Sequence, residues 1–370
     1  MKKLLIPLLL SNLIYAQSFV PDAPELNLKS YILIEPNTNT VIAEFNSSSE
    51  IEPASMTKIM TSYVVADQIA NGLISLEDQV LISEKAWRMG GSKMFIEAGK
   101  KVSISNLLKG IIIQSGNDAS VALAEHVAGS EGTFVLFMND YAQEIGMTNT
   151  RFENSSGLPH KDQYTTAKDM ALLSSAIIKD FPVFYEWYGQ KEFTYNNIKQ
   201  INRNKLLFTD STVDGLKTGW TQKAGYCLAT SANRVGMRLV SVVLGSASPA
   251  IRTAETEKLL DYGFRFFETQ SVNDISHQVP VFKSKKGNIK VGVADSSFLT
   301  LPRNQFKYTT QTIELSGDLI APISQGDQVG TLAISFNDED IATLPLIALE
   351  NAEEAGFVSK MIDTVKLMFR

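Results

Sequence analysis

A serine and a lysine stand three residues apart in the stretch Pro53-Ala54-Ser55-Met56-Thr57-Lys58. Residues with this spacing share one face of a helix, so the Lys58 amine could reach the Ser55 hydroxyl. A lysine whose pKa is lowered by burial and by a neighbouring cation can act as the base for a serine nucleophile. The alternative is a helix N-cap at Ser55 followed by a solvated lysine, and the pair alone does not separate the two.

The residues after Lys58 favour the chemical interpretation. Ile59, Met60, Val64, Val65 and Ile69 continue an apolar pattern, which predicts a helix over 55–70 that runs through a core. An unpaired lysine is costly in such a place and needs a reason to be there. The backbone N–H of a serine at the start of this helix could also stabilise an oxyanion.

A second candidate element is Ser115-Gly116-Asn117, between two segments with an apolar helical pattern over 105–114 and 118–128. A short connection between two buried helices can point inward. Asn117 would then offer an amide to a substrate carbonyl, and Ser115 a hydroxyl for proton relay. The alternative for Asn117 is a plain helix N-cap.

The third element is Lys217-Thr218-Gly219, on a predicted strand directly before Trp220. Glycine allows a substrate backbone to approach an edge strand closely. The hydroxyl of Thr218 and the charge of Lys217 suit a carboxylate, and we expect Lys217 to lower the pKa of Lys58 by repulsion. Together and in this order, the three elements are far more specific than any one of them.

The pattern of elements predicts an α+β fold for residues 25–267, with strands at both ends of this stretch and helices between them. A hairpin over 29–45 should complete a sheet formed by strands over 214–218, 225–231 and 237–244, and a helix is expected over 250–267. The polar residues 268–277 predict a linker. Short alternating runs over 278–350 predict a small all-β domain.

Both ends of the chain have distinct patterns. Two lysines and a short apolar run predict a secretory signal over residues 1–16, and hence a protein that works outside the cytoplasm. Residues 357–370 have the apolar spacing of an amphipathic helix with basic residues largely opposite. This helix could lie in an anionic membrane surface or pack on the protein itself, and the pattern does not decide.

Composition excludes several classes of function. The net charge of −6 gives no reason to expect nucleic-acid binding. Cys227 is the only cysteine, so no disulfide forms within the chain, and its apolar surroundings indicate a buried residue. The histidines His126, His160 and His277 show no ligand spacing. We therefore expect neither a cofactor nor a metal site.

The three motifs resemble those of the low-molecular-mass penicillin-binding proteins, specifically the D-alanyl-D-alanine carboxypeptidases. The resemblance runs nearly end to end and includes the stretches Asn202-Arg203-Asn204, Val213-Asp214-Gly215, Gly263-Phe264-Arg265-Phe266-Phe267 and Lys366-Leu367-Met368-Phe369. It implies a penicillin-binding transpeptidase or β-lactamase-like domain, an antiparallel sheet with helices on both sides, followed by the β domain and an amphipathic anchor.

The resemblance also implies roles for single residues. Ser55 would be acylated by the D-Ala-D-Ala carbonyl, with Lys58 as its base. Ser115 and Lys217 would pass the proton to the leaving amine, and Asn117 would hold the substrate amide. The N–H groups of Ser55 and Trp220 would form the oxyanion site. Thr218 and Arg252 would bind the substrate carboxylate, and Gly219 would contact the substrate as well. An exposed arginine at a helix start is the alternative for Arg252.

Trp220 departs from the family pattern, in which histidine usually follows Lys-Thr-Gly. An indole cannot exchange a proton near neutral pH, although the backbone N–H of Trp220 can still stabilise an oxyanion.

The implied reaction removes the terminal D-Ala from peptidoglycan stem peptides at the periplasmic face of the inner membrane, with β-lactams as covalent inhibitors. Rival interpretations are a DD-endopeptidase, a β-lactamase and a non-catalytic wall-binding protein. A class A β-lactamase needs Glu-x-x-Leu-Asn between the second and third motifs, and that string is missing between Asn117 and Lys217.

Overall fold

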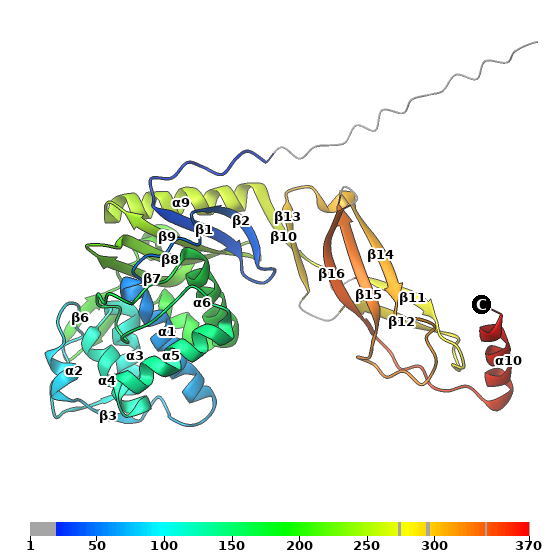
Figure 1. Ribbon diagram of the computed structural model, residues 1–370, viewed down its shortest axis with the longest axis horizontal. Helices are drawn as coiled ribbons and strands as arrows, with labels where there is room; N and C mark the ends of the chain where they lie inside the picture. The colour runs from blue at the N-terminus through cyan, green and yellow to red at the C-terminus, as the bar shows by residue number, and fades with distance from the viewer. Residues whose placement is uncertain (1–19, 273–274, 294–296, 337–338, 370) are drawn as a thin grey trace, which may run out of the picture.

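The structure, a computed structural model, describes residues 20–272, 275–293, 297–336 and 339–369. The predicted signal over residues 1–16 lies outside these ranges. Figure 1 shows an α+β part that contains the N-terminal hairpin, then a second part made of strands, then a C-terminal helix. This order confirms the fold class that the sequence predicted.

The first part is built on a five-stranded antiparallel sheet with the strand order β2-β1-β9-β8-β7. Its strands are β1 (Ser30–Glu35), β2 (Thr40–Phe45), β7 (Val213–Thr221), β8 (Gly225–Arg234) and β9 (Met237–Ser246). The N-terminal hairpin completes the sheet as expected, because Ile32 of β1 pairs with Val242 of β9. Strand β7 is left at one edge of this sheet, where its outer side can border a site.

Helices cover both faces of this sheet (Figure 1). Helix α6 (Ala167–Asp180) packs against β1 and β9 on one face, and α9 (Pro249–Phe266) packs against β8 and β9 on the other. Successive side chains of a strand point to opposite faces. Accordingly, Ile32 belongs to the core that contains α6, whereas Leu33 belongs to the core that contains α9.

A group of helices lies beyond α6 and carries most of the larger core. Helix α1 (Thr57–Ala70) is at its centre, and the ten residues from Thr57 to Ala66 are all buried, which confirms the expected helix through a core. Around it lie α2 (Glu84–Arg88), α3 (Ile104–Lys109), the π-helical η2 (Gly110–Gln114), α4 (Asn117–Ala128) and α5 (Glu131–Ile145). The short elements are β3 (Gln79–Leu81), β4 (Lys101–Ser103), α7 (Pro182–Tyr185), η3 (Glu186–Gly189), β5 (Glu192–Tyr195), β6 (Ile198–Ile201) and α8 (Leu206–Thr209).

The second part has a core of its own, which includes the fully buried Ile289, Leu332 and Leu346. Its main sheet has the strand order β11-β12-β16-β15-β14, and β10 pairs separately with β13. The strands are β10 (Phe267–Ser271), β11 (Ser276–Pro280), β12 (Asn288–Val293), β13 (Phe298–Pro302), β14 (Thr309–Leu315), β15 (Gln328–Phe336) and β16 (Glu339–Ala348), with η4 (Phe306–Tyr308) before β14.

Two details of this part differ from the sequence-based expectation. The polar composition of residues 268–277 predicted a linker, but β10 occupies Phe267–Ser271 and pairs with β13. Strand β16 was not predicted, because Glu339, Asp340 and Pro345 interrupt its apolar pattern. In both cases the strand is stabilised by pairing with another strand of the β domain, and local composition does not indicate this pairing.

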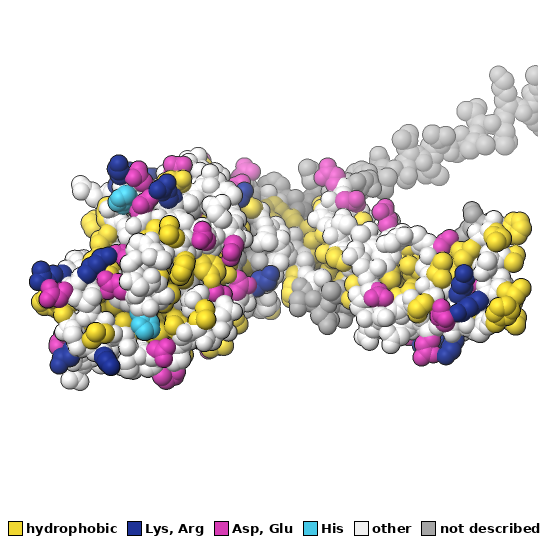
Figure 2. Space-filling view, turned by 60° about the horizontal axis from the view of Figure 1, so that its bottom comes forward, with side chains coloured by type: hydrophobic (Ala, Val, Ile, Leu, Met, Phe, Trp, Pro, Cys, Tyr) yellow, Lys and Arg dark blue, Asp and Glu magenta, His cyan; other side chains and the backbone are white. Residues whose placement is uncertain are grey.

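The C-terminal helix α10 (Phe357–Met368) has its apolar side chains in solvent, from 53% exposed at Ile362 to 79% at Phe357. Figure 2 shows hydrophobic side chains interspersed with lysines at this end of the molecule. The helix is held to the β domain through Asp363, which accepts the backbone N–H of Lys283 at 2.7 Å. Its apolar face is therefore not packed on the protein. Among the described residues, no helix is both long and apolar enough to cross a bilayer.

The packing of α9 on the sheet gives a prediction about stability. Leu260 of α9 is fully buried in the smaller core, so Leu260→Ala should reduce the free energy of unfolding by about 2–5 kcal/mol. The matched control is Leu136→Ala on α5, where the leucine is 63% exposed and a change within about 0.5 kcal/mol is expected. Urea denaturation of both variants measures the difference, and equal midpoints would contradict the assigned core.

Candidate active site

Ser55 lies in the short 3-10 turn η1 (Ala54–Met56), directly ahead of α1. Two other segments come very close to this turn. A Cβ atom at Gly157 would lie 1.8 Å from the carbonyl oxygen of Ala54, and one at Gly219 would lie 3.1 Å from Ala54 Cβ. Only glycine permits such an approach at position 157, and a side chain at position 219 would be tightly crowded. The turn, the loop around Gly157 and the end of β7 therefore meet at Ser55.

Lys58 is 1% exposed, and its Nζ lies 3.3 Å from Ser55 Oγ. The same Nζ donates to Asn117 Oδ1 at 2.8 Å and to the carbonyl oxygen of Ser156 at 2.5 Å. Burial lowers the pKa of Lys58 to about 7, helped by the positive charge of Arg203 and opposed by Asp118. The lysine is therefore both in reach of the serine and able to lose its proton near neutral pH.

The second motif lies at the junction of η2 and α4. Ser115 ends η2 with a left-handed backbone, φ 66°, and its buried Oγ has no hydrogen-bond partner among the described residues. Asn117 is the first residue of α4 rather than its N-cap, which is Gly116. The Asn117 amide accepts from Lys58 and donates to the Gly90 carbonyl oxygen at 2.7 Å. The N-cap alternative for Asn117 is therefore wrong.

The start of α4 also fixes the neighbouring loop. Asp118 is fully buried, and its carboxylate accepts the backbone N–H groups of Met94, Phe95 and Ile96 at 2.9–3.3 Å. It also accepts the backbone N–H of Ala119 at 2.9 Å. This carboxylate is therefore occupied by four donors, and Lys58 is left with neutral oxygens as its acceptors.

The third motif lies on the edge strand β7. Lys217 is 2% exposed, and its Nζ donates to the carbonyl oxygen of Thr218 at 3.1 Å. Burial lowers its pKa well below the usual value, with further lowering by the charges of Lys58, Arg203 and Arg252. The expected repulsion between the two buried lysines is present, and it lowers the pKa of Lys217. Arg203 also lowers the pKa of Lys58, and its guanidinium stays protonated when a lysine does not.

These residues border a cavity of about 760 Å³. Its lining includes Ser55, Ser115, Asn117, Thr218, Gly219, Trp220 and Arg252. The amines of Lys58 and Lys217 lie behind this lining, in the protein interior. The structure thus brings all nine residues singled out in the sequence to one place.

Two of the lining residues have contrasting surroundings. Arg252, in the first turn of α9, is 6% exposed, so the alternative of an exposed arginine is wrong. Its Nη1 donates to the Cys227 carbonyl oxygen at 3.5 Å, and its buried Nε has no partner among the described residues. Trp220 is 56% exposed, and its ring lies 5.8 Å from that of Tyr226, at the rim of the cavity.

Sequence reasoning assigned no role to two residues that matter here. The carbonyl of Ser156 holds Lys58, and a backbone group leaves no signal in residue type. Arg203 lines the cavity together with Lys205 and Arg252 and adds positive charge to it. The resemblance to the family included Asn202-Arg203-Asn204 and could have pointed to Arg203. The cavity is thus rich in cations and suited to an anionic group.

Comparison with known proteins agrees with this geometry. Residues 17–248 match the family described as D-alanyl-D-alanine carboxypeptidase, and residues 264–354 match the family described as penicillin-binding protein 5, C-terminal domain. The chain is 42% identical over 368 residues to D-alanyl-D-alanine carboxypeptidase DacC of Escherichia coli, which covers 96% of this chain and 92% of that protein.

Solved structures give the same result. Penicillin binding protein 5 from Haemophilus influenzae is 38% identical, with a TM-score of 0.82 over 90% of this chain and all of that one. Penicillin-binding protein D2 from Listeria monocytogenes in its ampicillin-bound form is 29% identical, with a TM-score of 0.60 over 65% of this chain and all of that one. The chain belongs to the D-alanyl-D-alanine carboxypeptidase family.

Proposed function

We propose that this chain removes the terminal D-Ala from peptidoglycan stem peptides through an acyl-enzyme on Ser55. The observation that carries the proposal is the buried Lys58 amine, 3.3 Å from Ser55 Oγ and with a pKa lowered to about 7. A serine hydroxyl needs a base in hydrogen-bond reach, and a lysine can be that base only when it is neutral. Both conditions are met beside an open cavity.

In the first step, Ser55 Oγ attacks the carbonyl carbon between the last two D-alanines while its proton moves to Lys58 Nζ. The carbonyl oxygen becomes an oxyanion, which we assign to the backbone N–H groups of Ser55 and Trp220. The C–N bond then breaks, and the leaving amine of D-Ala takes a proton from Ser115 Oγ, which is replenished through Lys217 with the proton that Lys58 removed from Ser55. Water later hydrolyses the ester, which frees the shortened peptide and returns the proton to Ser55.

The cations of the cavity account for the choice of a peptide with a free carboxylate. Thr218 would donate its hydroxyl to the terminal carboxylate, and the guanidinium of Arg252, which also lines the cavity, would supply positive charge. Charge-assisted hydrogen bonds of this kind are about twice as strong as neutral ones. The buried Arg252 Nε without a partner supports this assignment, since a ligand can satisfy it.

The same serine is the expected target of β-lactams, because their ring carbonyl and carboxylate imitate the peptide. The ampicillin-bound relative supports this. A DD-endopeptidase would use identical catalytic groups. It would differ from a carboxypeptidase in accepting a longer, cross-linked peptide past Trp220, which lies at the cavity rim. The contacts of Lys58 argue against a non-catalytic wall-binding protein, because a buried amine with no task is a cost to stability.

The proposal extends to where the enzyme works. Residues 1–16 would direct export, 25–267 form the peptidase domain, 268–277 lead into the β domain of 278–350, and 357–370 anchor the enzyme to the periplasmic face of the inner membrane. The exposed apolar side chains of α10 support this anchor, as do its lysines, which suit anionic lipid headgroups.

Replacing the nucleophile tests the reaction. Ser55→Ala should reduce D-Ala release from a pentapeptide stem by at least about 10³-fold, since the groups of such a site act as a unit. It should also abolish covalent labelling by a fluorescent penicillin. The control is Ser48→Ala, at an exposed serine away from the cavity, which should keep both activities. Release that persists in Ser55→Ala would overturn the proposal, and release from cross-linked dimers alone would identify an endopeptidase.

The pKa of Lys58 sets the pH dependence. Lys58 is the proton acceptor only as the neutral amine, so kcat/KM for D-Ala release should rise with pH through about 7. Arg203→Gln removes a cation that lowers this pKa, so the acidic limb of the profile should move to higher pH. Arg203→Lys keeps the charge and should leave the limb nearly in place. A limb that stays fixed or moves to lower pH in Arg203→Gln would contradict this role.

The anchor can be tested with vesicles that contain an anionic lipid. The double variant Phe357→Asp/Met361→Asp places two charges on the exposed apolar face and should lose vesicle binding at least tenfold, with D-Ala release in solution unchanged. Leu73→Asp, at a leucine 69% exposed in the first part of the chain, is the matched control and should bind as the parent does. Equal sedimentation of both variants with vesicles would refute the anchor.

A further inference from the structure

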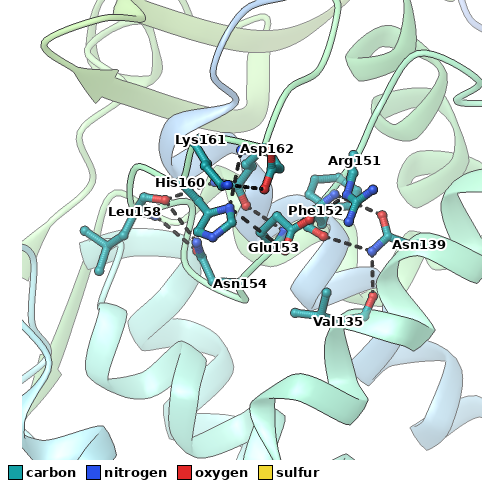
Figure 3. Close-up of polar contacts among 11 residues, drawn as sticks. Val135, Asn139, Arg151, Phe152, Glu153, Asn154, Leu158, His160, Lys161 and Asp162 are labelled. Carbon is teal, nitrogen blue, oxygen red and sulfur yellow. Dashed lines mark hydrogen bonds and ion pairs between the residues drawn. The ribbon is translucent and has the colours of Figure 1, made fainter.

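The loop from Arg151 to Tyr164 has one side on the active site and one side in solvent. Its ends are tied together, because the backbone N–H of each of these two residues donates to the carbonyl oxygen of the other, at 2.9 and 3.1 Å. On the inner side, the carbonyl oxygen of Ser156 accepts from Lys58, and Leu158 lines the cavity. The outer side is drawn in Figure 3.

The loop is stiffened by side chains within it. Asn154 Oδ1 accepts the backbone N–H groups of Ser156, Gly157 and Leu158 at 2.7–3.2 Å. Gln163 donates to the Leu158 carbonyl oxygen at 3.0 Å and accepts from the backbone N–H of Glu153 at 3.1 Å. Side chains on the outer surface of this loop are therefore held on a defined backbone.

Three potential ligands meet on that outer surface. Glu153, His160 and Asp162 each offer one ligand atom, and these atoms all lie within 4.8 Å of one another. His160 Nδ1 is 3.9 Å from Glu153 Oε2, and it accepts the backbone N–H of Asp162 at 3.4 Å. An imidazole binds a metal through the lone pair of one ring nitrogen. Figure 3 shows the imidazole beside both carboxylates.

We propose that Glu153, His160 and Asp162 form a binding site for a divalent transition-metal ion of the Zn²⁺ type. One imidazole and two carboxylates suit Zn²⁺, whereas Mg²⁺ and Ca²⁺ prefer oxygen ligands alone. Tetrahedral coordination at about 2.0–2.2 Å places ligand atoms roughly 3.4 Å apart. The His160 imidazole and the nearest Glu153 oxygen are 3.9 Å apart, so they need to approach by about half an ångström.

The positive side chains of Arg151 and Lys161 lie near the proposed site without occupying all of its carboxylate oxygens. Arg151 Nε pairs with Glu153 Oε1 at 2.5 Å, while the other carboxylate oxygen of Glu153 faces His160. Arg151 thus orients the carboxylate from behind, in the way that outer hydrogen-bond partners orient metal ligands. Lys161 lies 3.9 Å from an oxygen of Asp162, but both side chains are at least half exposed, so this ion pair is weak.

The expectation of no metal site rested on the separation of the three histidines in the sequence, and it overlooked a histidine that joins two carboxylates. An ion at this position would link residue 153 to residues 160 and 162 across the loop. It would thereby hold in place the segment whose Ser156 carbonyl contacts Lys58. The inference does not depend on the proposed reaction, because metal binding can be measured on its own.

The test is calorimetric titration of the purified full chain, without an affinity tag and stripped of metal, with ZnCl₂ in a weakly coordinating buffer. We expect one ion per chain. His160→Ala and Glu153→Gln should each weaken binding at least tenfold, and Ser55→Ala should bind normally. The matched controls are His126→Ala and His277→Ala, at two other exposed histidines, which should bind like the parent. CaCl₂ should give no comparable heat.

Limited trypsin digestion gives a second measurement. Cleavage after Lys161, whose side chain is 85% exposed, should slow at least twofold with Zn²⁺ in the parent and not in His160→Ala. The proposal fails if the parent binds no Zn²⁺, if His160→Ala keeps the parental affinity, or if His126→Ala loses as much. Thermal melts without metal show whether His160→Ala is folded. If it is not, Glu153→Gln and Asp162→Asn decide the outcome by the same criteria.

Discussion

The central constraint in this protein is a lysine amine that is buried without an opposing carboxylate in contact. The oxygens around Lys58 Nζ belong to a hydroxyl, an amide and a backbone carbonyl, all of them neutral. A carboxylate at the same distance would stabilise the ammonium and raise the pKa out of the useful range. The carboxylate of Asp118, which raises this pKa, instead accepts four backbone N–H groups, while the charge of Arg203 favours loss of the proton.

The need to keep the Lys58 amine buried beside Ser55 explains why the cores on both faces of the sheet are needed around the short turn η1. The turn at Ser55 contains Ala54 with φ 47°, a backbone region that is unfavourable for a residue with a side chain. It persists because buried α1 holds one side of the turn and the edge of the sheet holds the other. Gly157 and Gly219 then let two more backbones approach Ala54 closely. The site is thus assembled from segments that are held by packing far from the serine.

Much of this arrangement could be predicted from residue types and spacing, because three short motifs with distinct chemistry rarely occur together in one order. The apolar pattern after Lys58 also predicted its burial correctly. Contacts through the backbone, such as the Ser156 carbonyl, leave no mark on the sequence. The effect of Arg203 could not be separated from that of Lys217 without distances. Strands β10 and β16 were missed for a related reason, since their pairing depends on partners distant in the chain.

The remaining unsatisfied groups are concentrated where a ligand would sit. Ser115 combines a left-handed backbone with a buried hydroxyl that lacks a partner, and Arg252 buries a guanidinium nitrogen in the same condition. Each such group costs about 1–3 kcal/mol until something satisfies it. Oxygens of a bound peptide can accept from both groups, because both residues line the same cavity. The folding free energy lost at Ser115 and Arg252 is therefore regained when the peptide binds. A preorganised site of this kind favours its substrate over water.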